Sequence, residues 1–206
     1  MAGLVQRITM QDVKEKLGKL SITNQYQVHF SILKKTITDY LESIGLDNAK
    51  DFLSRDAGIL CSEASLPASA FATGEVKDNF MGIPQEFAHT RLYTDINFTF
   101  YVDQDYTLLR IFEGWMDYIS SGAEREVADF QKPFYRRMRY PDSYKCDTMF
   151  ITKFEKNMKR KLRYQFINTF PKSISPMPVT YGAADLLKVT VSFNYDRYIV
   201  ANQIDS

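Results

Sequence analysis

The sequence has little of several residue types on which catalysis and metal binding usually depend. Its 206 residues include nine Gly, two His and two Cys. Cys61 and Cys146 are far apart and belong to no C-x-x-C motif, which excludes a disulfide scaffold and a zinc knuckle and favours a reducing compartment. His29 lies in a strand-like alternation and His89 in a loop-like segment, and neither stands in a recognisable catalytic context.

The sequence motifs that are characteristic of common enzyme classes are also missing. The sequence contains no G-x-x-x-x-G-K-[ST], G-x-G-x-x-G, H-E-x-x-H or G-x-S-x-G pattern. We therefore expect a protein that is not an enzyme, with no catalytic residues, no cofactor and no bound metal. A small enzyme is the least favoured class, and a binding or structural protein is favoured over it.

Long hydrophobic runs are absent as well. No stretch reaches the roughly 18 apolar residues of a membrane-spanning helix, and residues 1–20 alternate charged with apolar positions where a signal peptide would be hydrophobic. We expect a soluble intracellular protein without a membrane anchor. The composition, 45% hydrophobic and 14% aromatic with a net charge of +1, is that of a globular chain, and its length fits a single domain over residues 1–206.

Apolar spacing of three and four residues predicts helices in three places. An N-terminal helix follows the T-x-x-D pattern that begins at Thr9, and a second helix covers residues 36–44 with Gly45 at its C-terminal cap. The third and longest helix is capped by Asp103 or Asp105 and runs to about residue 121. Its core face is formed by Leu108, Phe112, Trp115 and Ile119.

Alternation of apolar and polar residues predicts strands along the rest of the chain. The expected strands cover residues 25–32, 57–63, 96–103, 148–154, 162–170 and 187–198, with prolines 171, 176 and 178 in the link between the last two. Residues 68–95 read as an extended hairpin or long β-loop. The fold class is therefore α+β and mainly β: an antiparallel β-sandwich or barrel with one long packed helix, an N-terminal helix and an extended β-loop.

Positive charge is concentrated in one part of the chain. Residues 132–163 contain eleven Lys or Arg and three acidic residues, a net charge of +8, which leaves −7 for the remainder. Interleaved aromatic residues at 134–140 resemble a platform for single-stranded nucleic acid. The favoured alternative is a basic surface, with Lys132, Arg136, Arg137 and Arg139, that faces outward or contacts an acidic partner, such as a neighbouring copy.

Two blocks of sequence, which cover about half of the chain, resemble the tail tube proteins of contractile-tailed bacteriophages. The first block contains Ile59-Leu60-Cys61-Ser62-Glu63-Ala64-Ser65-Leu66-Pro67, Glu75, Gly82, Ala88-His89-Thr90-Arg91, the strand from Thr94 to Val102 and Phe112-x-x-Trp115. The second contains Asn168-Thr169-Phe170-Pro171-Lys172-Ser173-Ile174-Ser175, the spacer from Thr180 to Asp185 and the strand from Val189 to Tyr195. Related tube proteins occur in pyocins and type VI secretion systems. A helical insertion near 36–53 and an enlarged basic segment near 123–163 extend the tube fold.

The resemblance implies a structural virion protein that assembles as stacked hexameric rings. Double-stranded DNA would pass through the resulting tube without specific binding during genome ejection. The implied partners are further copies of the chain, a tail sheath protein, and baseplate and tail terminator proteins. The implied location is the virion tail, after assembly in the host bacterial cytoplasm. Two alternatives stay open: a baseplate tube initiator or other tail component, and a sequence-independent single-stranded nucleic-acid-binding protein.

The long β-loop is the predicted subunit interface. A loop of this kind can extend onto a neighbouring subunit or ring and pair with an open sheet edge. Its apolar residues would otherwise face water. The predicted interface residues are Phe71, Glu75, Val76, Phe80, Met81 and Phe87.

Overall fold

The computed structural model describes residues 10–18, 20–31, 33–76, 82–120, 137–155, 160–182 and 184–204. Helical segments are α1 (Met10–Leu17), α2 (Lys35–Ser43), α3 (Ala49–Asp51), the π-helical turn η1 (Phe52–Asp56), α4 (Ala57–Leu60), α5 (Thr107–Ile119) and α6 (Pro141–Tyr144). Strands are β1 (Tyr26–Phe30), β2 (Cys61–Ala64), β3 (Ser69–Val76), β4 (Gln85–Tyr93), β5 (Ile96–Tyr101), β6 (Cys146–Phe154), β7 (Arg160–Ile174), β8 (Lys188–Asn194) and β9 (Arg197–Ile204).

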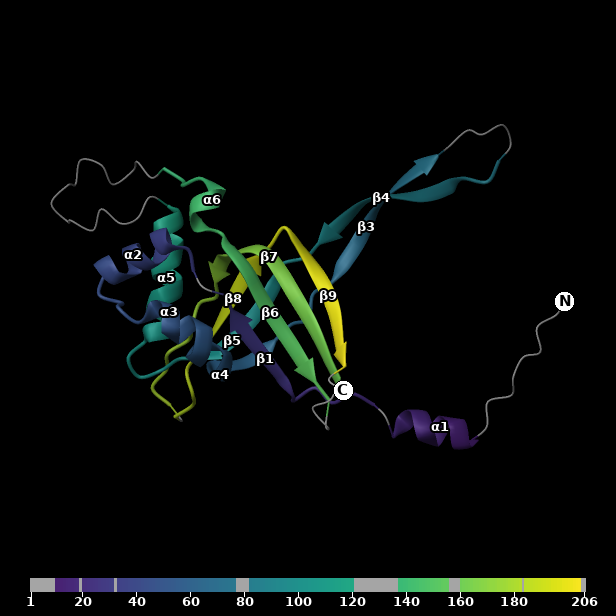
Figure 1. Ribbon diagram of the computed structural model, residues 1–206, viewed down its shortest axis with the longest axis horizontal. Coiled ribbons are helices and arrows are strands. Elements are labelled where there is room, and N and C mark those ends of the chain that lie inside the picture. Colours follow the sequence, from purple (N-terminus) through teal and green to yellow (C-terminus); the bar gives the residue numbers. More distant parts are fainter. Residues whose placement is uncertain are drawn as a thin grey trace.

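The body of the protein is built on one long strand, β7, which takes part in two antiparallel sheets. Its first half pairs with β6 and β9, and β6 pairs with β1; we call these four strands sheet A. Its second half pairs with β8, which pairs with β5 and then β2; these form sheet B. Figure 1 shows sheet A across the front of the body, with β5 and β8 behind it.

The strand β7 changes sheets at Asn168, which has a φ of 58°. Asparagine adopts this left-handed conformation more readily than most residues. A polar network fixes the corner: Asn168 Nδ2 and Lys145 Nζ each donate to Asp196, both at 2.7 Å. The hydrogen bond from Lys145 is the main reason that the pKa of Asp196 lies below its usual value.

The core lies between the two sheets and consists largely of aromatic side chains. Phe30 of β1 contacts Phe98 and Phe100 of β5 and Phe193 of β8, with ring centroids 5.7–6.4 Å apart. All four rings are fully buried, so the inward-facing residues of both sheets form one continuous apolar layer.

The helices α2, α3 and α5 gather at one end of the sheets (Figure 1). Asp103 accepts hydrogen bonds from the backbone N–H groups of Thr107 and Leu108, so this aspartate satisfies the first turn of α5 as predicted. Trp115 is fully buried on α5, and its indole N–H donates to the carbonyl of Tyr144 at 2.9 Å. The predicted core face of α5 is confirmed for its three fully buried members, Leu108, Phe112 and Trp115, and Ile119 packs partly buried against it.

Three details of the predicted secondary structure are wrong. Residues 57–63 begin as helix α4, and the strand β2 starts at Cys61, because the helical path from α3 through η1 continues into this segment. Residues 187–198 form two strands, since Tyr195 and Asp196 turn the chain at the corner between the sheets. Pro171 belongs to β7 and does not lie in a link; a register shift between Pro171 and Ser173 accommodates it.

The remaining predicted elements are confirmed. The helices near the N-terminus and at 36–44, the hairpin within 68–95 and the strands at 25–32, 96–103, 148–154 and 162–170 all occur, with ends that move by a few residues. The fold is thus an antiparallel β-sandwich with a long packed helix, as the sequence predicted.

Candidate assembly surfaces

The most prominent surface feature is the hairpin of β3 and β4, which we call the arm. It forms a separate two-stranded sheet and projects away from the body (Figure 1). Its large apolar side chains are open to water instead of being packed on the body. These side chains are Phe71, Val76, Phe87 and Leu92, with exposed fractions between 41% and 60%.

The base of the arm is held firmly on the body. Arg91 donates to the hydroxyls of Ser69 and Tyr198 at 3.2 and 3.1 Å, and its guanidinium lies 5.3 Å from the ring centroids of Tyr93 and Tyr198. Because these contacts join both arm strands to β9, the direction of the arm is fixed at its base.

A second set of contacts supports the turn that follows the arm. Asp95 accepts hydrogen bonds from Lys172 and from Asn194, which lie on β7 and β8. Partial burial works against the charged carboxylate, but these donors outweigh it and lower the pKa of Asp95. The carboxylate therefore stays ionised at neutral pH and keeps both donors in place.

The distal half of the arm carries negative charge. Glu75 and Glu86 are directly opposite each other in the register of β3 and β4. Like charges at opposite positions of an antiparallel pair are unfavourable.

The predicted interface residues Phe71, Glu75, Val76 and Phe87 all lie on the arm. The structure brings them together on one projecting element, and their role in a subunit interface stays a prediction. Phe80 and Met81 lie outside the described residues.

The outward face of sheet B is polar and mostly uncharged. Asn97 lies opposite Ser192, and Thr99 lies opposite Thr190, with their hydroxyls 3.1 Å apart. The face is bordered by Lys188 on β8, which lies over the ring of Tyr101, and by the exposed Glu63 on β2. Its centre therefore presents hydroxyl and amide groups to whatever lies in front of it.

The outward face of sheet A has a different character. Phe150 of β6 lies between His29 of β1, whose ring is stacked at a centroid distance of 6.2 Å, and Arg163 of β7, whose guanidinium carbon is 3.9 Å from the ring centroid. The Nε of Arg163 is buried without a hydrogen-bond partner in the described part of the chain. On the neighbouring strand β9, Arg197 and Ile199 are exposed. This face is cationic and partly apolar.

The predicted basic surface is described in part. Arg137 and Arg139 are exposed, and Arg139 is held on the end of α5, where its Nε donates to the Tyr118 carbonyl at 2.9 Å and its guanidinium covers the Tyr118 ring at 4.2 Å. Lys132 and Arg136 lie outside the described residues. The direction in which this surface faces within an assembly stays a prediction.

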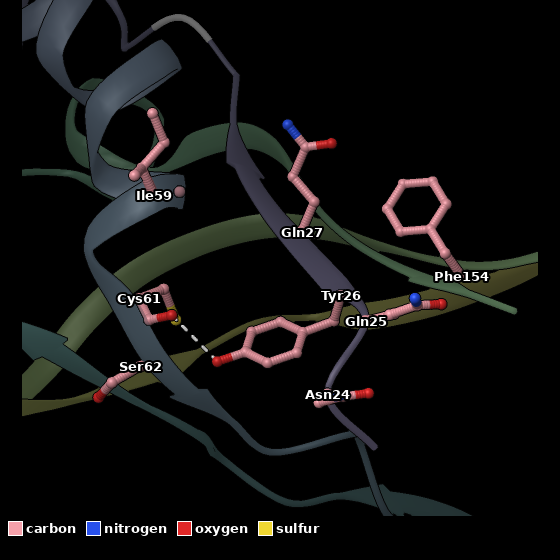
Figure 2. Close-up of a pocket in the computed structure, with 9 residues that line it drawn as sticks. Asn24, Gln25, Tyr26, Gln27, Ile59, Cys61, Ser62 and Phe154 are labelled. Atoms are coloured by element: carbon pink, nitrogen blue, oxygen red, sulfur yellow. Dashed lines mark hydrogen bonds between the residues drawn. The ribbon is translucent and has the colours of Figure 1, made fainter. Parts of the chain in front are cut away.

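An open pocket of about 690 Å³ lies where the edge strands β1 and β2 approach each other without pairing. The Tyr26 side chain crosses the gap, and its hydroxyl donates to the Cys61 carbonyl at 3.0 Å (Figure 2). Burial raises the pKa of Tyr26 and that of Cys61 to about 12. At neutral pH the pocket therefore offers a protonated thiol and phenol, which suit packing and hydrogen bonding rather than nucleophilic chemistry.

Two further properties concern ligands and membranes. The described residues contain no group of three or more His, Cys, Asp or Glu side chains placed to hold a metal ion. Within the same residues, no helix has the length and apolar character needed to cross a membrane.

Comparison with known families identifies the relatives of this fold. The sequence profile of the family described as phage tail tube protein matches residues 21–201. The chain belongs to the phage tail tube protein family. This match spans both sheets, the arm and α5 of the tail tube protein, and confirms the resemblance found in the sequence. A comparison with curated protein sequences finds no match.

Solved structures share the fold at low sequence identity. A chain in the cryo-EM structure of the anti-feeding prophage cap, the tube-terminating cap, matches with a TM-score of 0.53 and 12% identity, over 98% of this tail tube protein and 99% of that chain. A chain in the sheath–tube complex of the extracellular contractile injection system PVC, in the extended state, matches with a TM-score of 0.52 and 12% identity. The match covers 95% of this protein and 99% of that chain. A chain in the anti-feeding prophage baseplate matches with a TM-score of 0.52 and 8% identity, over 88% of this protein and 95% of that chain.

Sequence reasoning missed two groups of residues in this tail tube protein. The arm anchors Arg91 and Tyr198 are 107 positions apart, and they meet only because β9 runs beside the base of the arm. The stack of His29, Phe150 and Arg163 joins three strands. Their alternation patterns gave the outward positions, but the strand register that aligns them was needed to find the stack.

Proposed function

We propose that this protein is a structural virion protein that polymerises as stacked hexameric rings to form the inner tube of a contractile tail. The observation that carries the proposal is the arm. Its base is fixed by Arg91 and its distal part exposes apolar side chains such as Phe71 and Phe87, an arrangement that needs a second molecule to bury them. A head-to-tail contact made by such an element closes into rings or grows as a stack, depending on its geometry.

The two outward faces suit a tube of this kind. A bore that delivers double-stranded DNA must be wetted without holding the phosphate backbone, because each added Lys or Arg contact strengthens binding at low salt. The neutral face of sheet B, with Asn97, Thr99 and Thr190, meets this requirement. We assign this face to the bore and leave the cationic face of sheet A for contacts with protein.

The proposed surroundings follow from this role. The tube would be enclosed by a tail sheath protein and would end at baseplate and tail terminator proteins. It would be assembled in the host bacterial cytoplasm and reside in the virion tail. The fold neighbours named above come from sheath–tube, cap and baseplate assemblies, which supports partners of these kinds.

Electron microscopy of the purified protein tests the proposal. We expect rings or tubes from the complete chain, and a folded but unassembled protomer from a variant that lacks residues 76–87. The deletion removes the distal arm and leaves the anchors at its base, so circular dichroism should still show the body's helices and strands. Tubes of normal appearance from the deletion variant would contradict a role for the arm. Discrete monomers of the complete chain that bind single-stranded oligonucleotides in a salt-sensitive manner would support the nucleic-acid-binding alternative instead.

A tube initiator or terminator is the second candidate, because the fold is equally similar to chains from cap and baseplate assemblies. The two roles differ in how far assembly proceeds. A tube protein should elongate without limit as its concentration rises, whereas an initiator or terminator should stop at a single ring. The length distribution of the particles therefore separates the two candidates.

A further inference from the structure

The cationic face of sheet A and the acidic distal arm have complementary chemistry within one chain. We propose that the distal arm of one copy docks on the outward face of sheet A of a second copy, with Glu75 and Glu86 directed to Arg163 and Arg197. This inference rests on the proposed ring assembly and names the surface that receives the arm.

The receiving face carries a cation that is held in place. Arg163 lies over the ring of Phe150, which holds its guanidinium in place, and its Nε is buried without a hydrogen-bond partner in the described chain. Because Arg163 as a whole is only partly buried, its guanidinium can still pair with a carboxylate of a second copy. Its neighbours across the register, Thr152 on β6 and Ala201 on β9, are uncharged.

The charge of this face comes from Arg163 and Arg197. None of the described residues that alternate onto this face is acidic. They are Gln27, His29, Thr148, Phe150, Thr152, Phe154, Arg163, Gln165, Ile167, Arg197, Ile199 and Ala201. Two aspartates lie at its corner end. Asp196 is paired with Lys145 at 2.7 Å, and Asp147 lies 3.7 Å from Lys34, so each already has a lysine partner.

The arm supplies the opposite charge on an element that reaches outward. Its nine-residue strand β4 is about 30 Å long, comparable to the diameter of a small domain, so its distal end can lie on a neighbouring body. The opposed Glu75 and Glu86 concentrate two carboxylates there. Because they are paired in the register, both side chains lie on one face of the arm and can meet one surface.

Apolar contacts on both sides fit the same pairing. The arm exposes Phe71 on the same face as Glu75, and sheet A presents the half-buried Phe150 together with Ile199, which is 47% exposed. Charge pairs would then surround an apolar centre, which is the usual composition of a specific interface. A second copy of this chain therefore supplies carboxylates for the cations of this face and an apolar side chain for its apolar residues.

Charge reversal with rescue tests the inference. The variants are Arg163→Glu, the double change Glu75→Arg with Glu86→Arg, and all three changes in one chain. Assembly is measured by sedimentation and electron microscopy over a range of protein and salt concentrations. We expect the first two variants to raise the concentration needed for assembly by about tenfold or more, and the combined variant to recover most of that loss, since each interface again pairs opposite charges. Recovery also shows that the changed surfaces still fold.

Matched controls change the same charges elsewhere. Lys50→Glu on α3 and Asp39→Lys on α2 alter exposed residues away from both surfaces and should leave assembly unchanged. Normal assembly of Arg163→Glu, or a combined variant no better than the single changes, would overturn the inference. Normal assembly of the arm variant together with failed assembly of Arg163→Glu would also overturn it. That result would indicate that a different acidic protein binds the face. The inference would also be overturned if Arg163→Glu tubes assembled normally but no longer retained duplex DNA. That result would show that the face of sheet A lines the bore. Failure of the unaltered protein to form rings would instead overturn the proposed function, and with it this inference.

Discussion

The body and the arm use the same kinds of residue in opposite ways. In the body, Phe30, Phe98 and Phe193 are fully buried against one another, so the apolar surface is satisfied within one chain. In the arm, Phe71 and Phe87 are 60% and 51% exposed, although the two strands pair regularly. Hydrophobic content alone therefore does not tell which residues stabilise the protomer. The body should determine the free energy of unfolding, and the arm should determine assembly.

The largest effect on the body is expected from Trp115→Ala. The change leaves a large cavity on the core side of α5 and removes the hydrogen bond to the Tyr144 carbonyl. We expect the free energy of unfolding to fall by about 3–5 kcal/mol, a large part of the roughly 5–15 kcal/mol of a typical domain. Denaturant unfolding measures the loss. As a control, Ile59→Ala, at a side chain that is 77% exposed, should change it by less than about 0.5 kcal/mol. Equal effects of the two changes would show that Trp115 is not part of the core.

A smaller loss is expected where α4 meets β1. A Cβ added to Gly58 would lie 2.3 Å from the Val28 carbonyl oxygen, which is backbone and cannot turn away. Gly58→Ala should therefore destabilise the protein by about 1–3 kcal/mol, even though alanine favours helix by about 1 kcal/mol. Gly182→Ala is the matched control, since the nearest atom, Thr180 Oγ1, is 3.7 Å away. A stabilised Gly58→Ala variant would mean that α4 does not pack closely against β1, the edge strand of sheet A.

The sequence predicted the body better than its corners. Strict alternation in residues 96–103 and the apolar spacing of α5 reflect burial on one side, so periodicity alone was sufficient for these elements. The same alternation runs through residues 187–198 and conceals the turn at Tyr195 and Asp196. That turn is fixed by the contacts of Asp196 with Asn168 and Lys145, which lie 28 and 51 residues away and leave no local pattern.

The candidate surfaces divide in the same way. The arm was predictable, because a long segment with turn residues and apolar positions suggests a hairpin that binds a partner. The neutral face of sheet B was visible in the Asn, Thr and Ser positions of its strands. The cationic face of sheet A was not, since Arg163 lies within a long basic segment, and the strand register decides which of its residues share a face with Phe150.

A third prediction concerns the corner between the sheets and depends on pH. The hydrogen bond from Lys145 lowers the pKa of Asp196, so the folded state favours the ionised carboxylate. The stabilisation is present above the ordinary aspartate pKa of about 4 and is lost as the pH falls through the lower pKa of the folded state. Asp196→Asn should reduce the free energy of unfolding at pH 7, and the difference from the unaltered protein should shrink towards pH 3. Because the Asp196 side chain is 45% exposed, water screens the pair and the effect at pH 7 should stay below about 1 kcal/mol. A difference that does not vary with pH would show that the charge of Asp196 does not hold the corner.

The smallest effect on protomer stability, and the sharpest separation of arm from body, is expected from Phe71→Ser. This side chain is 60% exposed on the arm and packs against no part of the core, so its loss should change the free energy of unfolding of the dilute protomer by less than about 0.5 kcal/mol. Assembly should nevertheless fail or require a much higher protein concentration, because the apolar contact with the neighbouring copy is removed. Val179→Ser supplies the control, as Val179 is 85% exposed but lies between β7 and β8, away from the arm. If both variants assemble normally, exposed apolar residues on the arm do not contribute to the interface. If Phe71→Ser instead unfolds the protomer, the arm belongs to the cooperative unit of the body, and the distinction between the two regions is wrong.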